Sequence, residues 1–417
     1  MLNITFVYPD FENLGVEYLM SLCKEQGHNV NLVFYCAEDP YTGIKSKSLD
    51  YKAIAKRIVE TKPDVAIFSC ITDNFRHQLN CATELKSINP EIYVIFGGIH
   101  VTAVPHKVIR QGAVDAVAIG EGEVSIPTFL AEYERNKTVT LLNSEIDGIV
   151  YKKEGFLVGS YLPGKSWDLD KIPFPAKEQF YKAMGYVPKE YYIITSRGCP
   201  YKCSYCYNSL DKIPLRRRSV DNVIAELKGA KEKFKIKYVH FCDDSFTTNW
   251  DWVKEFSKSY KKEIALPFLC SVNPLLINKE IIGYLKDAGC VDIQIGVQSL
   301  SEKLCREVLK RKTDNKKIKE ALLLIKEAKM MVQVDQMLGI PGDSLEIQEE
   351  SLLFYKELKP NLVSVFWLTY YPGTEIVTIA KERGILTDED VQRIEEGYKL
   401  AEGGLHPTLT ESIRKQG

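Results

Sequence analysis

Three cysteines crowd into the short segment SRGCPYKCSYCYN at residues 196–208, and they are the side chains of this sequence best suited to chemistry. Cys199, Cys203 and Cys206 are separated by three and then by two residues. Three thiolates at this spacing can hold three irons of a four-iron cluster, because cysteine is the soft ligand that such clusters use. No fourth cysteine or histidine stands nearby, so the fourth iron would stay open to another ligand.

Two other interpretations of this loop compete with an open cluster. A structural zinc site needs four protein ligands, whereas the nearest histidine downstream is His240. Three unrelated buried thiols fit poorly with a loop that also contains Gly198, Pro200 and Lys202. The sequence therefore favours a cluster with one open iron.

From residue 191 onward the chain alternates strand and helix patterns, and the cysteines follow the first of these strands. Apolar runs such as YYIITS, VDIQIG and MVQVDQM are separated by helical stretches, which gives about six βα units. Six units are too few for a closed eightfold barrel and predict an open, partial (βα)6 barrel. The loops that follow the strands of such a barrel carry its chemistry, and the cysteines lie in one of them.

The first part of the chain has the pattern of an α/β domain with a doubly wound parallel sheet. NITFVYP, NVNLVFY, DVAIFS, IYVIFGG and DAVAIG are short, nearly continuous apolar runs, as in strands that are buried on both faces. The amphipathic stretches between them, at 14–26, 51–61 and 75–88, predict crossover helices. We expect about five strands, with ligands at their carboxyl ends.

The alternation lapses after residue 134. The run IDGIVYKKEGFLVGSY predicts a hairpin that turns at Glu154 and Gly155, and LPGKSWDLDKIPFPAKEQF predicts a proline-punctuated linker. The expected organisation is a first domain at 1–142, a hairpin and linker at 143–190, a partial barrel at 191–383 and a helical tail at 384–417.

Composition bounds the class of protein. The 417 residues include 55 basic and 56 acidic side chains, so no overall basic field exists to attract nucleic acid or an anionic membrane. The start lacks a basic leader, and no segment approaches the roughly 20 apolar residues that span a bilayer. The 11 cysteines, an odd number, do not look like a disulfide framework. We expect a cytoplasmic protein with no nucleic-acid partner and no membrane span.

The segment CPYKCSYC resembles the CxxxCxΦC pattern of radical S-adenosylmethionine (SAM) enzymes, with Tyr205 in the aromatic position. The resemblance covers about 191–383 and implies a [4Fe-4S] cluster with Cys199, Cys203 and Cys206 as its metal ligands. It implies that the open iron binds the amino and carboxylate groups of SAM, and that an electron from the cluster breaks a carbon–sulfur bond to give a 5'-deoxyadenosyl radical. It also implies an electron donor such as flavodoxin or ferredoxin.

The same resemblance assigns SAM contacts to further positions. Asp244 aligns with the acidic residue that meets the methionine amino group, whereas its neighbour Asp243 could instead be a solvated loop acid. Gln298 aligns with the residue that meets the ribose, and glutamine can hydrogen-bond a diol. Arg311 would face the carboxylate, although an exposed arginine at a helix end is an equal alternative. The implied SAM contacts are Tyr205, Asp243, Asp244, Gln298, Arg311 and Gly339, the last in the turn GIPGDS.

Two segments do not follow the resemblance closely. Ser271 in CSVNP stands where relatives often carry arginine, which leaves that SAM contact open. The cluster LRRRS at 215–219 could hold an anionic group of the substrate, or it could be surface charge ahead of a helix.

In the first domain, FGGIHVTAVPHKVI and DAVAIGEGE together resemble the cobalamin-binding domain attached to one large class of radical SAM enzymes, over about 1–135. Glycines in these loops permit close backbone approach to a bulky ligand at strand ends. Hydroxyls in SCIT could contact the nucleotide tail of the cofactor or cap the next helix. A flavodoxin-like fold that binds nothing is the plain alternative. The implied cobalamin contacts are Ser69, Thr72, Gly97, Gly98, His100, Thr102, Gly120, Glu121 and Gly122.

The loop after the first strand bears on how cobalt would be ligated. Domains that ligate cobalt through histidine carry DxHxxG there, whereas this chain has DFENLG with Glu12 at the histidine position. We therefore expect no histidine ligation of cobalt, and we interpret His100 as a polar contact or turn residue.

The resemblance implies two kinds of reaction on an unidentified substrate. In one, the radical activates an unactivated carbon that then takes a methyl group from methylcobalamin, as in a C-methyltransferase. In the other, cobalamin assists an oxidation, ring closure or rearrangement without methyl transfer. A non-catalytic cobalamin-binding module is a third hypothesis, which the intact cysteine loop and Asp244 argue against.

Overall fold

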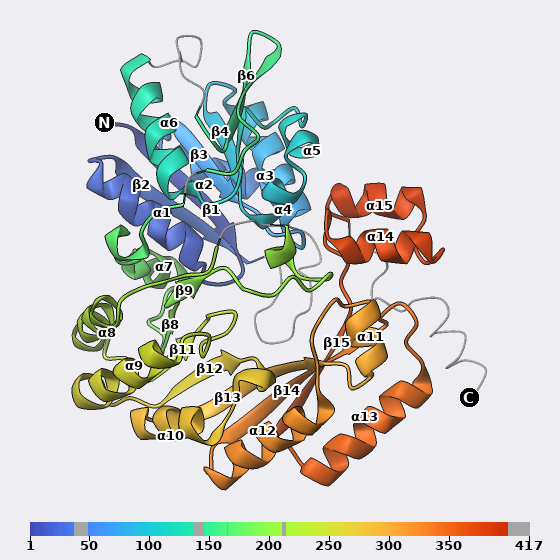
Figure 1. Cartoon of the computed structure of the whole chain (residues 1–417). Coiled ribbons are helices and arrows are strands. Elements are labelled where there is room, and N and C mark those ends of the chain that lie inside the picture. The colour runs from blue at the N-terminus through green and yellow to red at the C-terminus, as the bar shows by residue number, and fades with distance from the viewer. Residues whose placement is uncertain (37–48, 137–145, 165, 211–213, 399–417) are drawn as a thin grey trace. The chain divides into compact units, whose positions relative to one another are not determined.

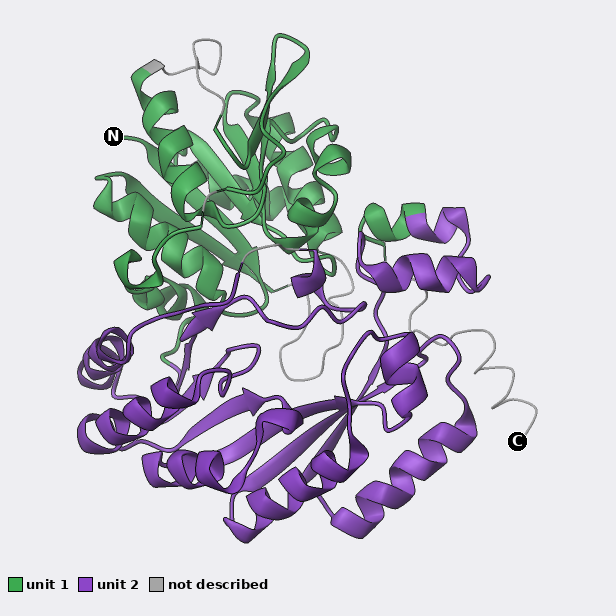
Figure 2. Cartoon of the chain, viewed as in Figure 1, with its two compact units in different colours: residues 1–187, 392–399 green, residues 188–391, 400–417 purple. Residues whose placement is uncertain are grey.

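The computed structural model describes residues 1–36, 49–136, 146–164, 166–210 and 214–398, which form two compact units. Among the described residues, the first unit comprises 1–187 and 392–398, and the second comprises 188–391 (Figure 2). No helix within the described ranges is long and apolar enough to cross a membrane.

The first unit is built on a seven-stranded sheet in the order β2-β1-β3-β4-β5-β6-β7 (Figure 1). The first five strands in this order are parallel, and their apolar side chains are buried, which confirms the predicted doubly wound sheet. Chain order reverses between β1 and β3, the switch point where ligands of such sheets bind. The parallel strands are β1 (Asn3–Pro9), β2 (Asn29–Tyr35), β3 (Val65–Ser69), β4 (Tyr93–Gly97) and β5 (Ala116–Ala118).

Helices connect these strands, and their ends are set by local capping. The Asn13 side chain accepts a hydrogen bond from Val16 N at the start of α1, and Asp50 does the same for Ala53 N at the start of α2. Helix α1 packs beside α6, and α2 beside α3. The helices are α1 (Leu14–Glu25), α2 (Tyr51–Glu60), α3 (Phe75–Ile88), α4 (Ile99–Ala103), α5 (Pro105–Ile109) and α6 (Gly122–Asn136).

The predicted hairpin is present, but it belongs to the first sheet. β6 (Ile149–Lys153) and β7 (Phe156–Gly159) turn through Glu154 and Gly155, both with positive φ. β6 pairs antiparallel with β5, because the short parallel strand would otherwise leave its backbone groups unpaired at the sheet edge. The first unit therefore runs to residue 187 and includes α7 (Lys177–Met184), beyond the expected boundary at 142, which itself lies outside the described residues.

The second unit is built on a six-stranded parallel sheet in the order β15-β14-β13-β12-β11-β8, which confirms the partial (βα)6 barrel (Figure 1). Its strands are β8 (Glu190–Ile193), β11 (Tyr238–Phe241), β12 (Phe268–Val272), β13 (Cys290–Gln298), β14 (Met331–Leu338) and β15 (Leu362–Trp367). Its helices are α8 (Val220–Phe234), α9 (Trp250–Glu263), α10 (Lys279–Ala288), α11 (Glu302–Glu307), α12 (Asn315–Glu327), α13 (Leu345–Leu358) and α14 (Glu375–Glu382).

Short elements complete the description. A two-stranded ribbon joins β9 (Ser196–Arg197) to β10 (Arg216–Arg217). Helix α15 (Asp388–Glu395) begins the predicted helical tail, and residues 399–417 of that tail lie outside the described residues.

Strand alternation decides which side chains of the barrel can do chemistry. On β13, Ile293, Ile295 and Val297 are buried in the apolar core. The residues between them, Gln294 and Gly296, point to the opposite face, because successive side chains of a strand alternate. The inner face of the barrel is therefore polar.

Candidate functional site

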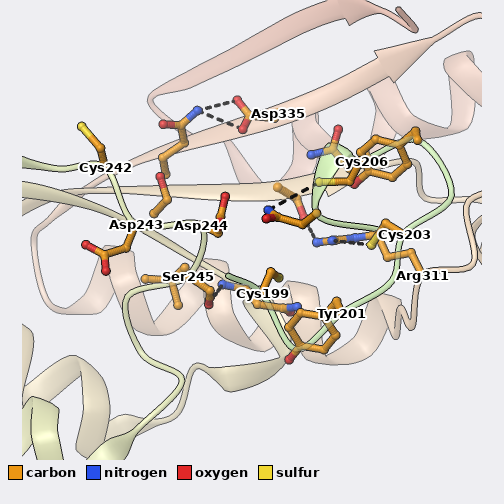
Figure 3. Close-up of a pocket in the computed structure, with 18 residues that line it drawn as sticks. Cys199, Tyr201, Cys203, Cys206, Cys242, Asp243, Asp244, Ser245, Arg311 and Asp335 are labelled. Carbon is orange, nitrogen blue, oxygen red and sulfur yellow. Dashed lines mark hydrogen bonds between the residues drawn. The ribbon is translucent and has the colours of Figure 1, made fainter. Parts of the chain in front are cut away.

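A pocket of about 350 Å³ lies at the carboxyl ends of the barrel strands (Figure 3). It is formed by the cysteine loop after β8, the loop after β11, the polar face of β13 and Arg311. The structure brings together eight of the residues predicted for this half of the chain: Cys199, Cys203, Tyr205, Cys206, Asp243, Asp244, Gln298 and Arg311.

The cysteine loop is anchored by its own backbone and by the segment after α11. Gly198 has φ +82°, a conformation that favours glycine. Ser204 N donates to Leu309 O (2.9 Å), and Ser204 Oγ donates to Val308 O (2.6 Å). These bonds hold the three thiols at one wall of the pocket.

The three thiols suit a cluster better than a single ion. Within the described ranges, no three cysteine, histidine, aspartate or glutamate side chains gather closely enough to hold one metal ion. In a [4Fe-4S] cluster each thiolate binds a different iron, so the thiols need only face a common space. Burial raises the pKa of Cys206 to about 11, so cluster binding must displace its proton.

Arg311 lies in the pocket and not at an exposed helix end. Its Nη1 donates toward Cys203 Sγ (3.8 Å), and its Nη2 donates to Gly296 O (2.5 Å). Burial lowers the pKa of Arg311, but nearby Tyr205 and Cys203 outweigh burial and leave the pKa raised. Arg311 is therefore a fixed positive charge beside the cysteine loop, and its contact with a carboxylate stays a prediction.

Gly296 makes room for this arrangement, and sequence reasoning missed it. A Cβ atom at Gly296 would lie 2.7 Å from Gln298 Nε2 and 3.7 Å from Arg311 Nη2. Gln298 has φ +70°, and the strand register shifts between Gly296 and Gln298. The irregular end of β13 thus places the Gln298 amide in the pocket, where the ribose contact remains a prediction.

The two neighbouring aspartates have different roles. The Asp243 side chain is fully buried, and it accepts hydrogen bonds from Thr195 N (3.0 Å), Thr195 Oγ1 (2.8 Å) and Ser196 Oγ. Asp244 is accessible within the pocket, and Figure 3 shows it pointing toward the cysteine loop while Asp243 points away. Partial enclosure raises the pKa of Asp244, an effect that a hydrogen bond from Asn208 opposes. Asp244 is the better placed of the two to meet a ligand.

Gln294 and Asp335 line the pocket too, and the sequence patterns did not single them out. Gln294 Nε2 donates to both carboxylate oxygens of Asp335, at 3.0 and 2.9 Å. Both residues lie within strands that are otherwise apolar. Only the direction of their side chains in the structure shows that they face the pocket. Gly339 does not line the pocket; its N–H donates to Asp343 Oδ2 (3.1 Å), and its nucleoside contact remains a prediction.

In the first unit, the predicted cobalamin loops meet at the carboxyl ends of β3, β4 and β5. Gly98 has φ +96°, and a Cβ there would lie 2.5 Å from Cys70 O, so only glycine fits. Thr102 Oγ1 accepts a hydrogen bond from Gly120 N (2.9 Å). The remaining predicted positions in these loops are Ser69 and Gly97, which are register partners of β3 and β4, with Glu121 and Gly122 at the start of α6.

His100 is held within this set of loops. It is 1% exposed, its Nδ1 lies 3.2 Å from Thr72 Oγ1, and its ring stacks on Phe75 at 4.3 Å. Burial lowers the pKa of His100 to about 4, so the ring is neutral. Its Nε2 atom is buried with no hydrogen-bond partner among the described residues. An unsatisfied buried nitrogen among these loops fits a polar ligand such as cobalamin.

Two family models match the chain. That of the B12 binding domain matches residues 2–130, and that of the Radical SAM superfamily matches residues 193–354. The first range contains the five parallel strands of the first sheet, and the second contains the cysteine loop and most of the partial barrel.

Relatives span most of the chain. An uncharacterized methyltransferase of Pyrococcus horikoshii is 28% identical in an alignment of 380 positions that covers 89% of this chain and 79% of that protein. An anaerobic magnesium-protoporphyrin IX monomethyl ester cyclase of Rubrivivax gelatinosus is 21% identical in an alignment of 391 positions that covers 89% of this chain and 68% of that protein. The solved structure of the radical SAM methyltransferase TsrM from Kitasatospora setae, with cobalamin and [4Fe-4S] cluster bound, covers 92% of this chain and 78% of its own at a TM-score of 0.74. At 16% identity, that likeness shows the shared fold.

Proposed function

This chain belongs to the radical SAM enzymes that carry an N-terminal B12-binding domain, and we propose that it methylates an unactivated carbon atom of its substrate. Its cofactors are a [4Fe-4S] cluster, SAM and cobalamin. The observation that carries the proposal is the likeness, along 89% of the chain, to a relative named as a methyltransferase.

The residues of the pocket support this chemistry. The cluster and cobalamin, when bound, supply electron transfer and methyl transfer respectively. The thiolates of Cys199, Cys203 and Cys206 line the pocket and would hold three irons of the cluster. Asp244 accepts hydrogen bonds from the amino group of SAM, and Arg311 offsets the negative charge of the thiolates.

Further contacts orient SAM in the same pocket. The Gln298 amide hydrogen-bonds the ribose hydroxyls, and Tyr205 lies against the adenine. In the first unit, the loops that contain Gly98 and Gly120 would hold cobalamin, and His100 would act as a polar contact. A flavodoxin or ferredoxin of the cytoplasm supplies the electron.

A cobalamin-assisted oxidation, ring closure or rearrangement is the alternative. The likeness to a cyclase along 89% of the chain favours it specifically. Both reactions use the same thiols and the same SAM contacts, so the products must separate them.

The deciding experiment is anaerobic reconstitution with iron, sulfide and cobalamin, followed by turnover of a metabolite extract with methyl-labelled SAM. Methyl transfer yields S-adenosylhomocysteine, 5'-deoxyadenosine and a labelled product. Ring closure or oxidation yields 5'-deoxyadenosine without S-adenosylhomocysteine. The matched control is the triple Cys199→Ala, Cys203→Ala, Cys206→Ala variant, which should give neither nucleoside product.

A further inference from the structure

Arg217 lies in the cluster LRRRS, but its side chain is turned away from solvent and does not line the cysteine pocket. Its side chain is 9% exposed, and its guanidinium packs over the Trp252 ring at 4.6 Å. It stands on β10, where it pairs with Ser196 of β9, three residues before Cys199. An arginine enclosed in this way needs charged or hydrogen-bonding partners from the protein.

The hydrogen bonds of Arg217 reach two different loops. Nη1 donates to Thr195 Oγ1 (2.8 Å), at the start of the cysteine loop. Nη2 donates to Phe246 O (3.0 Å) and to Thr248 Oγ1 (3.0 Å), in the loop after β11. One planar guanidinium therefore fixes the distance between the two loops.

Asp243 also connects the loop after β11 to the start of the cysteine loop. It belongs to the loop after β11, yet its fully buried carboxylate accepts hydrogen bonds from Thr195 and Ser196. Arg217 Nη1 lies 3.9 Å from Asp243 Oδ1, so the two charges balance each other. The loop that carries Asp244 and the loop that carries the cysteines are tied by both partners of this pair.

We propose that Arg217 and Asp243 are positioning residues for SAM. They hold the Asp244 carboxylate at a fixed place relative to the cysteine loop, so that the amino group of SAM reaches the open iron and Asp244 together. The inference rests on the proposed use of SAM. It predicts that loss of the pair weakens SAM binding but leaves cluster assembly intact. An Arg217 side chain used in this way is not available to hold an anionic group of the substrate.

Arg218, the next residue in the chain, makes a different set of contacts. Arg218 bonds Glu226 (2.7 Å) on α8 and donates to Ile194 O (3.0 Å), so it attaches β10 to the helix layer. The loop after β11 takes no part in these two bonds. The link between the two loops is thus made by Arg217 and Asp243, and these two bonds of Arg218 add nothing to it.

The test uses the full chain with its reconstituted cluster. Arg217→Gln should keep its iron and sulfide content and its visible absorption, while the dissociation constant for SAM in equilibrium dialysis rises at least tenfold. Thr248→Val removes only one contact of Arg217 and should raise that constant by a smaller factor, which covers the case in which Arg217→Gln does not fold. Arg217→Lys should restore part of the affinity, because it keeps the charge but loses the fork of donors.

Two further readouts separate positioning from general stability. The electron paramagnetic resonance of the reduced cluster should change when SAM is added to the parent protein, and change less in Arg217→Gln. Arg306→Gln, at an exposed arginine of α11, is the matched control and should behave as the parent.

Three outcomes would overturn the inference. One is parent-like SAM affinity in folded Arg217→Gln or Thr248→Val. Another is loss of iron from Arg217→Gln with unchanged thermal unfolding, because the pair would then serve the cluster and not SAM. If the parent itself binds a cluster but no SAM, the proposed function fails and the inference fails with it.

Discussion

Glu12 and Lys177 form a buried ion pair, although 165 positions separate them in the sequence. Their side chains are 5% and 1% exposed, and Lys177 Nζ also lies 3.0 Å from Glu17 Oε2. The residue that replaces the cobalt-ligating histidine is thus engaged by a lysine of α7. A carboxylate held in this way is a poor candidate for a metal ligand.

We predict that bound cobalamin carries no protein nitrogen on its lower face. Glu12 stands at the position of the ligating histidine, and its carboxylate is paired with Lys177, so this loop supplies no nitrogen donor. Electron paramagnetic resonance of the one-electron-reduced cofactor checks this, because a nitrogen donor would split each cobalt line into three. Triplet splitting that disappears in His100→Ala would contradict the prediction. Splitting that persists would point to the cofactor's own base or to another residue.

Lys177→Met should destabilise the first unit by roughly 3–5 kcal/mol, because it leaves the buried Glu12 carboxylate without its cation. Urea unfolding followed by circular dichroism measures the loss. Lys182→Met is the matched control, since Lys182 is exposed on the same helix and should change stability little. A loss equal to that of the control would show that the triad does not stabilise the fold.

The stability of the first unit should fall as the pH rises from about 4.5 toward 8. Burial raises the pKa of Glu17 to about 8, so the folded chain retains a proton that the unfolded chain releases. Stability falls with pH wherever the folded state binds more protons. Glu17→Gln should flatten the dependence of the melting temperature on pH in this window, while Glu232→Gln, at an exposed site, should leave it unchanged. Equal slopes in all three proteins would refute the assignment.

Alanine in place of Cys199, Cys203 or Cys206 should abolish the broad visible absorption of the reconstituted cluster and the formation of 5'-deoxyadenosine. Each thiolate binds its own iron, so the loss of one leaves an unstable cluster. Cys36→Ala, an exposed cysteine of the first unit, should retain both signals. SAM cleavage by any of the three single variants would count heavily against the cluster assignment.

Gly98→Ala should raise the dissociation constant for cobalamin at least tenfold. The added Cβ would meet Cys70 O at 2.5 Å in a backbone conformation of φ +96°, so the loops after β3 and β4 must separate. Gly112→Ala is the control, because a Cβ there meets nothing within 4 Å. Equilibrium dialysis with cobalamin compares the two, and equal affinities would show that the close approach of these loops is not needed.

Local sequence patterns determined both folds and the cluster loop. The pattern of apolar residues along a strand shows which of its faces are buried. Burial on both faces gives a continuous apolar run such as VAIFS, and burial on one face gives an alternating run such as CVDIQIGVQ. Ligand spacing in the cysteine loop is likewise local, since Cys199, Cys203 and Cys206 lie within a few residues of one another. The same holds for the hairpin turn at Glu154 and Gly155, which the sequence predicted correctly.

Tertiary structure alone decided which distant groups meet. The hairpin pairs with the first sheet because the backbone groups at the edge of β5 need hydrogen-bond partners. No local sequence pattern shows that β5 is the edge to which the hairpin pairs. Arg311 contacts Cys203, Arg217 donates hydrogen bonds to two loops, and Glu12 forms an ion pair with Lys177. A buried charge must find an opposite charge or hydrogen-bond partners wherever packing brings one within reach, and that reach depends on how whole helices and strands are placed.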